Sequence, residues 1–243
     1  MLFESLHHEL LTFVFGNRCP SEEKIQEMIL RCSDLFTFLA EKRSLHYLSH
    51  PQTLQGYLLY FVPITLHKLY KVLLEITRHP LFLSNYEELR ILDLGCGPAP
   101  ALLAFVELEK QNLFPRLALH YTGVDFDYTS LQVAEKLVQK LIPLSPRIRY
   151  QFLRRDLRTG KVFQEFRKLA PQFVILSNLV GELETQGITA TEVAQRLKPL
   201  ATNDTHLATI IIEPATRKTS QTLHKLRDLL LEHNRLSLCT MYR

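Results

Sequence analysis

The sequence predicts an α/β protein in which a doubly wound, mostly parallel sheet follows an N-terminal helical domain. Three observations predict this class. Residues 90–111 have the pattern of a strand, a glycine turn and a helix, and short apolar strands alternate with amphipathic helices from there on. Residues 1–88 show helical periodicity. Short, continuously apolar strands with helices between them are typical of a parallel sheet covered on both faces.

The N-terminal domain is predicted to contain three helices. The first covers Phe3–Phe15, where apolar residues are interleaved with Glu and His. The second begins after Ser21, a residue type that caps helices, and its apolar residues recur at helical spacing to about Lys42. The third covers Thr53–Ile76 and is predicted to be kinked or interrupted at Pro63, because proline has no backbone N–H.

Residues 89–243 are predicted to form the second domain, in which strands and helices alternate. The predicted strands are Ile91–Leu94, Leu119–Val124, Ile148–Leu153, Phe173–Leu176, Leu207–Ile212 and Leu236–Thr240. The helices predicted between them are Ala99–Gln111, Ser130–Leu141, Val162–Leu169, Ala190–Leu197 and Ser220–His233. No internal repeat or low-complexity segment interrupts this order.

The turn after the first of these strands is the main candidate for a binding site. Asp93 places a carboxylate near the strand end, and Gly95 and Gly97 let the backbone turn tightly and approach a ligand. Cys96 between them fits a small, buried turn residue. The N–H groups that begin the following helix point into the same crevice. This arrangement is how open α/β sheets hold a nucleotide-like cofactor.

An acidic residue ends the next strand. Asp125, followed by Phe126, lies about 30 residues after the glycine turn, and a carboxylate there can accept both hydroxyls of a ribose. The alternative is that Asp125 and Asp127 only cap the helix that begins near Thr129. The position of Asp125 favours ribose binding, whereas both interpretations stay open for Asp127.

Composition argues against several classes of protein. The longest apolar stretch, Tyr57–Ile76, carries Pro63 and two lysines, so no membrane span is expected. The N-terminus does not suit a secretory signal, and the four cysteines lack Cys-x-x-Cys spacing. The ten histidines show no metal-binding spacing, so no metal site is expected. We therefore expect a cytoplasmic protein with reduced cysteines.

The net charge of +4 is unevenly distributed. Residues 1–88 hold 8 Lys and Arg against 10 Asp and Glu, whereas the remaining residues hold 21 against 15. A basic second domain is compatible with RNA as a partner, although ordinary domains reach similar values.

Residues 90–235 resemble the class I S-adenosylmethionine (SAM) methyltransferases. Four landmarks carry the resemblance in order, namely the Asp93–Ala99 turn, Asp125, Asp156 and Ser177-Asn178. The resemblance implies a Rossmann-like fold with SAM as cofactor. The residues it implies for SAM binding are Asp93, Gly95, Cys96, Gly97, Asp125, Phe126, Asp156, Leu157 and Ser177.

Within that superfamily the chain resembles the mitochondrial and bacterial small-ribosomal-subunit methyltransferase-like family. The segments that carry this resemblance are Gly56–Thr65 with Val72–Ile76, Asn178–Leu183, and Ile212–Thr216 with Arg227–Leu230. The resemblance implies a SAM-dependent methyltransferase that acts on RNA, specifically that of the small ribosomal subunit.

The resemblance also implies roles for individual side chains. Asp156 would bond the adenine amino group with Leu157 beside it. The alternative is an ion pair between Asp156 and Arg154, Arg155 or Arg158 on a solvated loop. Asn178 would orient the methyl acceptor, and Glu182 would accept a proton or position a group. The alternatives are a turn residue for Asn178 and a surface helix residue for Glu182.

The chain departs from the family pattern at several positions. Phe61 stands where the family tends to have Arg, and Ala215 replaces a glycine. Only Cys239 lies where members often carry a cysteine-rich metal-binding segment, so no metal site is implied. We also expect one strand fewer than the usual seven.

Two other functions remain open from the sequence. Gly95–Pro100 and Asn178–Gly181 also resemble enzymes similar to nicotianamine synthase, which transfer the aminobutyrate arm of SAM to an amine. The second alternative is a non-catalytic ribosome-assembly factor that binds SAM or no cofactor. The oligomeric state is not predicted.

The aromatic series Tyr57, Tyr60, Phe61 and Tyr70 has two interpretations. Core or inter-domain packing is the more common role for such a series. The more specific and less common alternative is a platform on which a flipped base stacks.

Overall fold

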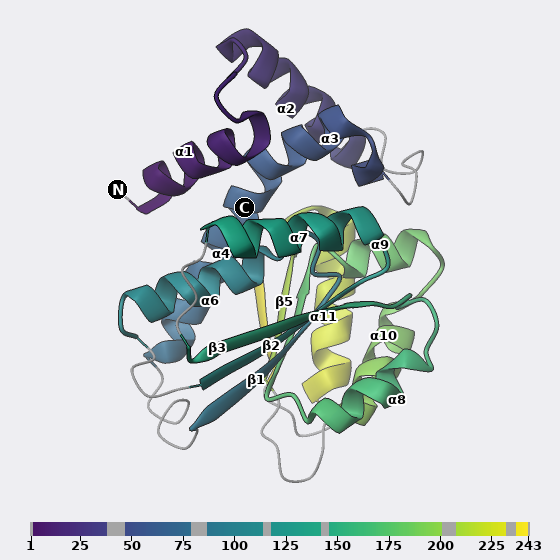
Figure 1. Ribbon diagram of the computed structural model, residues 1–243. Helices are drawn as coiled ribbons and strands as arrows, with labels where there is room; N and C mark the ends of the chain where they lie inside the picture. The colour runs from purple at the N-terminus through teal and green to yellow at the C-terminus, as the bar shows by residue number, and fades with distance from the viewer. Residues whose placement is uncertain are drawn as a thin grey trace.

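The computed structural model describes residues 2–37, 47–78, 87–113, 118–141, 146–200, 208–231 and 237–242. A parallel sheet with helices on both faces forms the body of the molecule, and three helices lie above one edge of that sheet (Figure 1). The predicted fold class is therefore confirmed.

Six described strands form one sheet in the order β3-β2-β1-β4-β5-β6. Their bounds are β1 Glu88–Leu94, β2 Ala118–Asp125, β3 Ile148–Arg154, β4 Phe173–Ser177, β5 Ala208–Pro214 and β6 Ser237–Tyr242. Every pairing between neighbours is parallel. The strand order reverses between β1 and β4, so a crevice is expected at their carboxyl ends.

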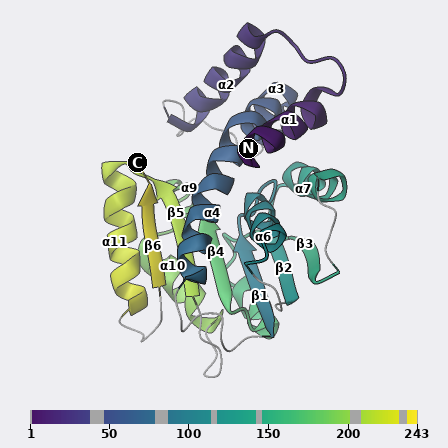
Figure 2. The same ribbon diagram turned by 90° about the vertical axis from the view of Figure 1, so that its left-hand side faces the viewer.

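Helices α1 to α3 lie above the edge of the sheet, and the other helices divide between its two faces. Their bounds are α1 Leu2–Phe15, α2 Glu22–Thr37, α3 Pro51–Gly56, α4 Val62–Thr77, α6 Pro100–Lys110, α7 Tyr128–Leu141, α8 Val162–Phe166, α9 Val180–Thr185, α10 Ala190–Leu197 and α11 Arg217–Leu231. Short 3-10 turns occur at η2 Tyr47–Ser49, η4 Arg167–Leu169 and η5 Lys198–Leu200. Figure 2 shows α4 and α6 in front of the strands and α11 beside β6.

Alternate residues of the strands supply two separate cores. Ile91 and Ile175 pack in one core with residues of α4, α6 and α7, whereas Leu92 and Val174 pack in the other with residues of α8 to α11. This division follows from the pleat, because successive side chains of a strand point to opposite faces. Both faces are covered, which explains why the strands are continuously apolar.

Where the sequence predicted a kink or an interruption at Pro63, the structure has a π-helical turn within a continuous helix. Residues 51–77 run through α3, a π-helical turn η3 (Tyr57–Phe61) and α4, with Pro63 near the start of α4. A proline ring in an α-helix collides with the carbonyl four residues earlier, and a π turn relieves that collision. The helix therefore continues instead of breaking.

Helix α4 belongs to the core of the sheet. Leu69 and Val72 of α4 are fully buried in the same cluster as Ile91 of β1 and Phe105 of α6. The predicted domain boundary near residue 88 stays a prediction, since residues 79–86 lie outside the described residues. The predicted end of the second helix at Lys42 also lies outside them. No described helix is long and apolar enough to cross a membrane.

We expect Leu69→Ala to lower the free energy of unfolding of the whole protein by about 2–5 kcal/mol, because it opens a cavity in the core that α4 shares with the sheet. Urea unfolding followed by circular dichroism measures this, with the exposed Lys71→Ala on the same helix as a matched control. Two separate transitions, of which only one shifts, would show that α4 is not part of the sheet's core.

Candidate functional site

A cavity of about 770 Å³ lies at the carboxyl edge of the sheet, beneath the N-terminal helices. Its floor is formed by the turns that follow β1, β2, β3, β4 and β5, and its roof by residues of α2, η3 and α4. It lies at the reversal point between β1 and β4, where open α/β sheets bind ligands. Its volume is within the range of small-molecule sites.

The cavity brings together most of the residues that the sequence marked. The predicted residues in its lining are Gly95, Gly97, Asp125, Phe126, Asp156, Leu157, Ser177, Asn178 and Glu182. Asp93 and Cys96 are not in the lining, since both are buried beneath the turn.

The glycine turn is held against the end of β2. The N–H groups of Gly95 and Cys96 donate to the Val124 carbonyl at 2.8 and 3.0 Å. Gly95 has a φ of 69°, which side chains rarely adopt, and a Cβ there would lie 2.8 Å from Leu179 Cδ1. A side chain at Gly95 would therefore push the loop after β4 away from the turn.

Asp125 joins the turn to the start of α7. Its Oδ2 accepts the Gly97 N–H and its Oδ1 accepts the Asp127 N–H, both at 2.9 Å. Burial raises the pKa of Asp125 to about 6, although these two N–H groups lower it. Each oxygen keeps capacity for a further donor, such as a ribose hydroxyl.

Asp127 caps α7. Its Oδ2 accepts the backbone N–H of Ser130 at 3.1 Å and the Ser130 hydroxyl at 2.8 Å. Asp127 therefore caps the helix, as one of its two interpretations predicted, and it also lines the cavity.

The side chains of Asp93 and Cys96 support the turn from below. Asp93 is 2% exposed and accepts the hydroxyl of Tyr121. Burial raises the pKa of Asp93 to about 7, against the hydrogen bond from Tyr121, which lowers it. Cys96 packs against Gly123, where a Cβ would lie 2.9 Å from its Sγ. Burial raises the pKa of the Cys96 thiol, which does not suit a nucleophile.

The turn after β3 places Asp156 in the cavity together with an arginine. Arg158 pairs with both carboxylate oxygens of Asp156, with a shortest N–O distance of 2.6 Å, and lies 5.5 Å from the centre of the Phe126 ring. Hydrogen bonds from Arg158 lower the pKa of Asp156. Asp156 thus forms the ion pair and also lines the cavity. Arg158 lines the cavity too, although the sequence suggested it only as a possible ion-pair partner.

The loop after β4 forms the other half of the floor. Asn178 has a φ of 57°, its N–H donates to the Ile212 carbonyl at 2.8 Å, and its side-chain amide donates to Thr65 Oγ1 at 3.4 Å. The Ser177 hydroxyl beside it is buried and has no hydrogen-bond partner in the described part of the chain. Such a hydroxyl is a position where a ligand or water bonds.

Glu213 holds this loop and is a site residue to which sequence reasoning gave no defined role. It is 2% exposed, and its Oε1 accepts the Val180 N–H at 2.6 Å. Burial raises its pKa to about 7, although N–H groups of the loop lower it, and the charge of Glu182 raises it further. Its sequence signal was an acidic residue at the end of the buried apolar strand β5, followed by Pro214.

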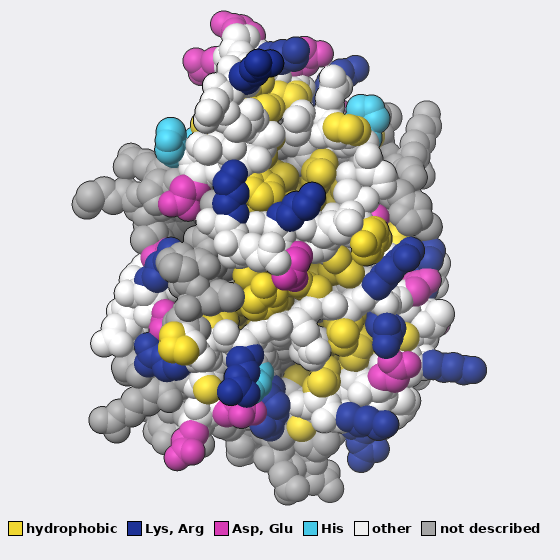
Figure 3. Space-filling model, in the orientation of Figure 1, with side chains coloured by type: hydrophobic (Ala, Val, Ile, Leu, Met, Phe, Trp, Pro, Cys, Tyr) yellow, Lys and Arg dark blue, Asp and Glu magenta, His cyan; other side chains and the backbone are white. Residues whose placement is uncertain are grey.

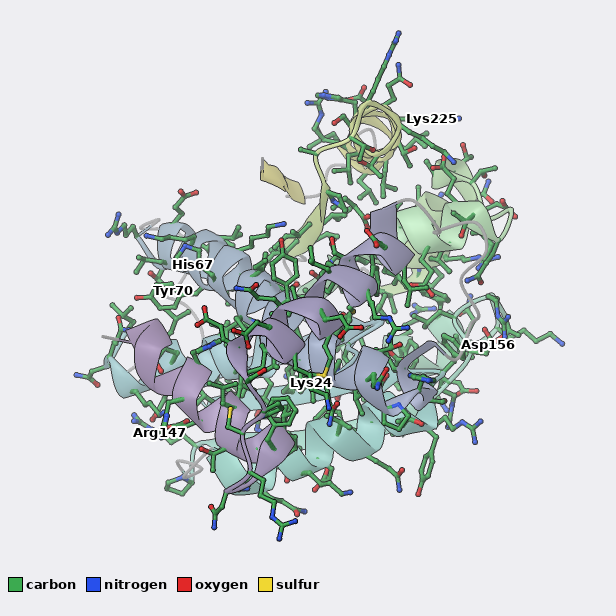
Figure 4. The ribbon with its side chains drawn as sticks, turned by 90° about the horizontal axis from the view of Figure 1, so that it is seen from above. Lys24, His67, Tyr70, Arg147, Asp156 and Lys225 are labelled. Carbon is green, nitrogen blue, oxygen red and sulfur yellow. The ribbon has the colours of Figure 1, made fainter. Side chains whose placement is uncertain are left out.

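The aromatic series divides between two places. Tyr57, Tyr60 and Phe61 line the cavity. The Tyr70 hydroxyl donates to Gln111 Oε1 at 2.8 Å, which joins α4 to the end of α6. Figure 4 shows Tyr70 and His67 on the opposite side of the molecule from Asp156.

Charged side chains do not form a single basic area on the face seen in Figure 3. Lys and Arg are scattered among acidic side chains there, with a hydrophobic band across the middle. Among the described residues no group of three His, Cys, Asp or Glu side chains is placed to hold a metal ion.

The strand order and the cavity at its reversal point define a doubly wound, Rossmann-like α/β protein. The chain belongs to the family described as mitochondrial small ribosomal subunit Rsm22, whose model matches residues 51–238. No curated protein matches the chain.

Several solved structures are similar to the chain. An O-methyltransferase family protein from Burkholderia thailandensis is 15% identical, with 78% of this chain and 53% of that chain covered and a TM-score of 0.45. The plantazolicin methyltransferase BpumL, solved in complex with SAH, is 17% identical, with 98% of this chain and 73% of that chain covered and a TM-score of 0.37. The DszA carbon methyltransferase is 16% identical, with 83% of this chain and 48% of that chain covered and a TM-score of 0.42. The chain thus spans about half the length of the first and third.

We expect Asp93→Asn to stabilise the protein above neutral pH. Because the folded-state pKa of about 7 exceeds the ordinary 3.8, the stability linked to Asp93 is present at low pH and lost as the pH rises through about 7. Removing the buried charge should raise the melting temperature at pH 8 by a few degrees, at roughly 2–4 °C per kcal/mol, and by less at pH 5.5. Thermal unfolding at both pH values measures this, and an equal shift at the two would contradict it.

Proposed function

We propose that the protein is a SAM-dependent methyltransferase that acts on RNA of the small ribosomal subunit. One observation carries the proposal, which is that a single cavity gathers the glycine turn, Asp125, Asp156 and the loop of Asn178. Membership of a family described by the mitochondrial small ribosomal subunit supports the choice of partner.

The lining fits SAM in three respects. Gly95 and Gly97 allow the backbone to approach a ligand without side chains in between. Asp125 has acceptor capacity for ribose hydroxyls, and Phe126 and Leu157 offer apolar surface for a purine. The buried hydroxyl of Ser177 has no partner in the described chain and can bond a polar group of the ligand. When bound, SAM supplies a methyl group on a positively charged sulfonium.

The chain's own residues would position the two reactants. Asp125 would hold the ribose, and the Asp156–Arg158 pair would border the base. Asn178, fixed by its backbone bond to Ile212, presents an amide that can orient the acceptor. Glu182 lines the same cavity, and its charge raises the pKa of both Asp125 and Glu213. A carboxylate in this position would accept a proton from the group that is methylated. Proximity and orientation would supply most of the rate.

We expect Asp125→Asn to weaken SAM binding at least about tenfold, because hydrogen bonds to a charged group contribute roughly 1.5–3 kcal/mol. Isothermal titration calorimetry measures the affinity. The matched control is Asp228→Asn, whose carboxylate lies exposed on α11 beside Arg227. Undetectable SAM binding by the unaltered protein would contradict the proposed cofactor.

The reaction itself is tested with SAM labelled in the methyl group, incubated with small ribosomal subunits, total RNA or protein extract. We expect the label in ribosomal RNA, with S-adenosylhomocysteine as the second product and loss of labelling in Asp125→Asn. Methylthioadenosine as the product would instead indicate aminobutyrate transfer. SAM binding without any transfer would favour the non-catalytic assembly factor.

A further inference from the structure

The helix above the cavity presents two parallel rows of side chains to it. Residues 57, 61 and 65 form one row and residues 60, 64 and 68 the other, and all six line the cavity. Both rows are aromatic or aliphatic at their N-terminal end and polar at Thr65 and Lys68. We call Phe36, Tyr57, Tyr60, Phe61 and Ile64 the aromatic roof.

The rings of the aromatic roof support one another. Tyr57 and Phe61 are stacked, with ring centres 5.4 Å apart and planes 25° apart, and Phe36 of α2 lies 4.4 Å from Phe61. Tyr60 meets Phe61 edge-on at 5.1 Å. The π turn at residues 57–61 gathers three of these rings in five consecutive residues. The rings of the roof therefore pack against one another in stacked, tilted and edge-on contacts, which support the ring of Tyr60.

Part of this surface is exposed. Tyr60 is 38% exposed and Ile64 is 36% exposed, although both belong to a helix whose other face is fully buried. An aromatic ring and an isoleucine exposed toward a concave site mark a place where an apolar or planar group binds.

Hydrogen-bonding groups lie at the inner end of the same rows. Thr65 accepts the Asn178 side-chain amide at 3.4 Å, which joins the helix to the loop after β4. Lys68 is half-buried, and the charge of Glu213 acts on it. An amide offers both a donor and an acceptor, and a carboxylate offers acceptors. A ligand here would meet the apolar side chains of the roof on one side and polar groups at one edge.

We propose that the aromatic roof is the acceptor subsite and that it takes a single nucleobase, turned out of an RNA strand and stacked on the exposed ring of Tyr60. The polar edge of that base lies toward Asn178. This inference rests on the proposed function and names the form in which the RNA enters the site. Aromatic platforms bind unpaired bases with little dependence on sequence, because each base has a flat face.

The same geometry predicts a preference for unpaired RNA. A base must leave its stack before it reaches an enclosed pocket, and that cost is lowest where the base is already single-stranded. A peptide side chain is the competing occupant, and the experiment below separates the two.

The chain contains no tryptophan, so a single one introduced into the roof reports on its surroundings. We expect the emission of Tyr60→Trp, measured with saturating S-adenosylhomocysteine, to fall at least about twofold on adding single-stranded oligoribonucleotides of about 12 residues, because bases stack on the indole. Duplex RNA of the same sequence should quench less. Ile64→Trp is a second reporter, should Tyr60→Trp fail to fold.

Tyr128→Trp is the matched control. Tyr128 is 56% exposed, lies near Arg154 and is outside the lining of the cavity. Its emission should stay nearly constant on adding RNA. Equal quenching at both positions would mean that the RNA binds the general surface, and that outcome would overturn the proposal.

Tyr60→Leu tests the affinity, since it keeps an apolar side chain but removes the ring. We expect RNA binding to weaken about tenfold while SAM affinity by calorimetry changes less than about twofold. Unchanged RNA binding, no quenching at either roof reporter, or quenching by a peptide but not by RNA would each overturn the roof assignment. Absence of SAM binding by the unaltered protein would instead contradict the proposed function. Failure of the roof assignment and failure of the proposed function are therefore distinguishable.

Discussion

The site depends on one interaction, in which the buried carboxylate of Asp125 accepts the backbone N–H groups of Gly97 and Asp127. The bond to Gly97 ties the turn after β1 to the end of β2, and the bond to Asp127 sets the start of α7. Both turns then face one cavity. Because the carboxylate must be buried to reach the two groups, its pKa rises to about 6. The cofactor half of the site is thus positioned by a charge that is costly to bury and is partly compensated by the backbone.

A second buried carboxylate organises the opposite half. Glu213, at the end of β5, accepts the Val180 N–H and so fixes the loop that carries Asn178 and Glu182. The bond between Asn178 and Thr65 then connects this loop to α4. Two acidic residues at strand ends therefore hold the two halves of the floor, and the charge of Glu182 acts on both. The site has its shape because buried backbone N–H groups in the loops at the strand ends need acceptors, which the carboxylates of Asp125 and Glu213 supply.

Much of this could be predicted from the sequence because it follows local patterns. Continuously apolar strands between amphipathic helices predicted the parallel sheet, and Gly95 and Gly97 marked the turn. Asp125 was found because its distance from that turn suits a neighbouring strand end. Arg158 was not singled out as a site residue, because its contact with Phe126 crosses between strand ends 32 residues apart. Helix α9 was not among the predicted helices, although Glu182 was considered as a helix residue, since six residues are too few for a periodic pattern to show.

The sequence by itself determined the class of fold, the parallel order of strands and helices, and the turns that carry the candidate cofactor residues. The tertiary structure decided which of those residues face the cavity. Asp93 and Cys96 precede or lie within the turn, yet they point beneath it toward Tyr121 and Gly123. Tyr57, Tyr60 and Phe61 form the roof whereas Tyr70 joins α4 to α6. Spacing along a helix or strand fixes which residues share a face, but only packing against distant segments fixes what that face meets.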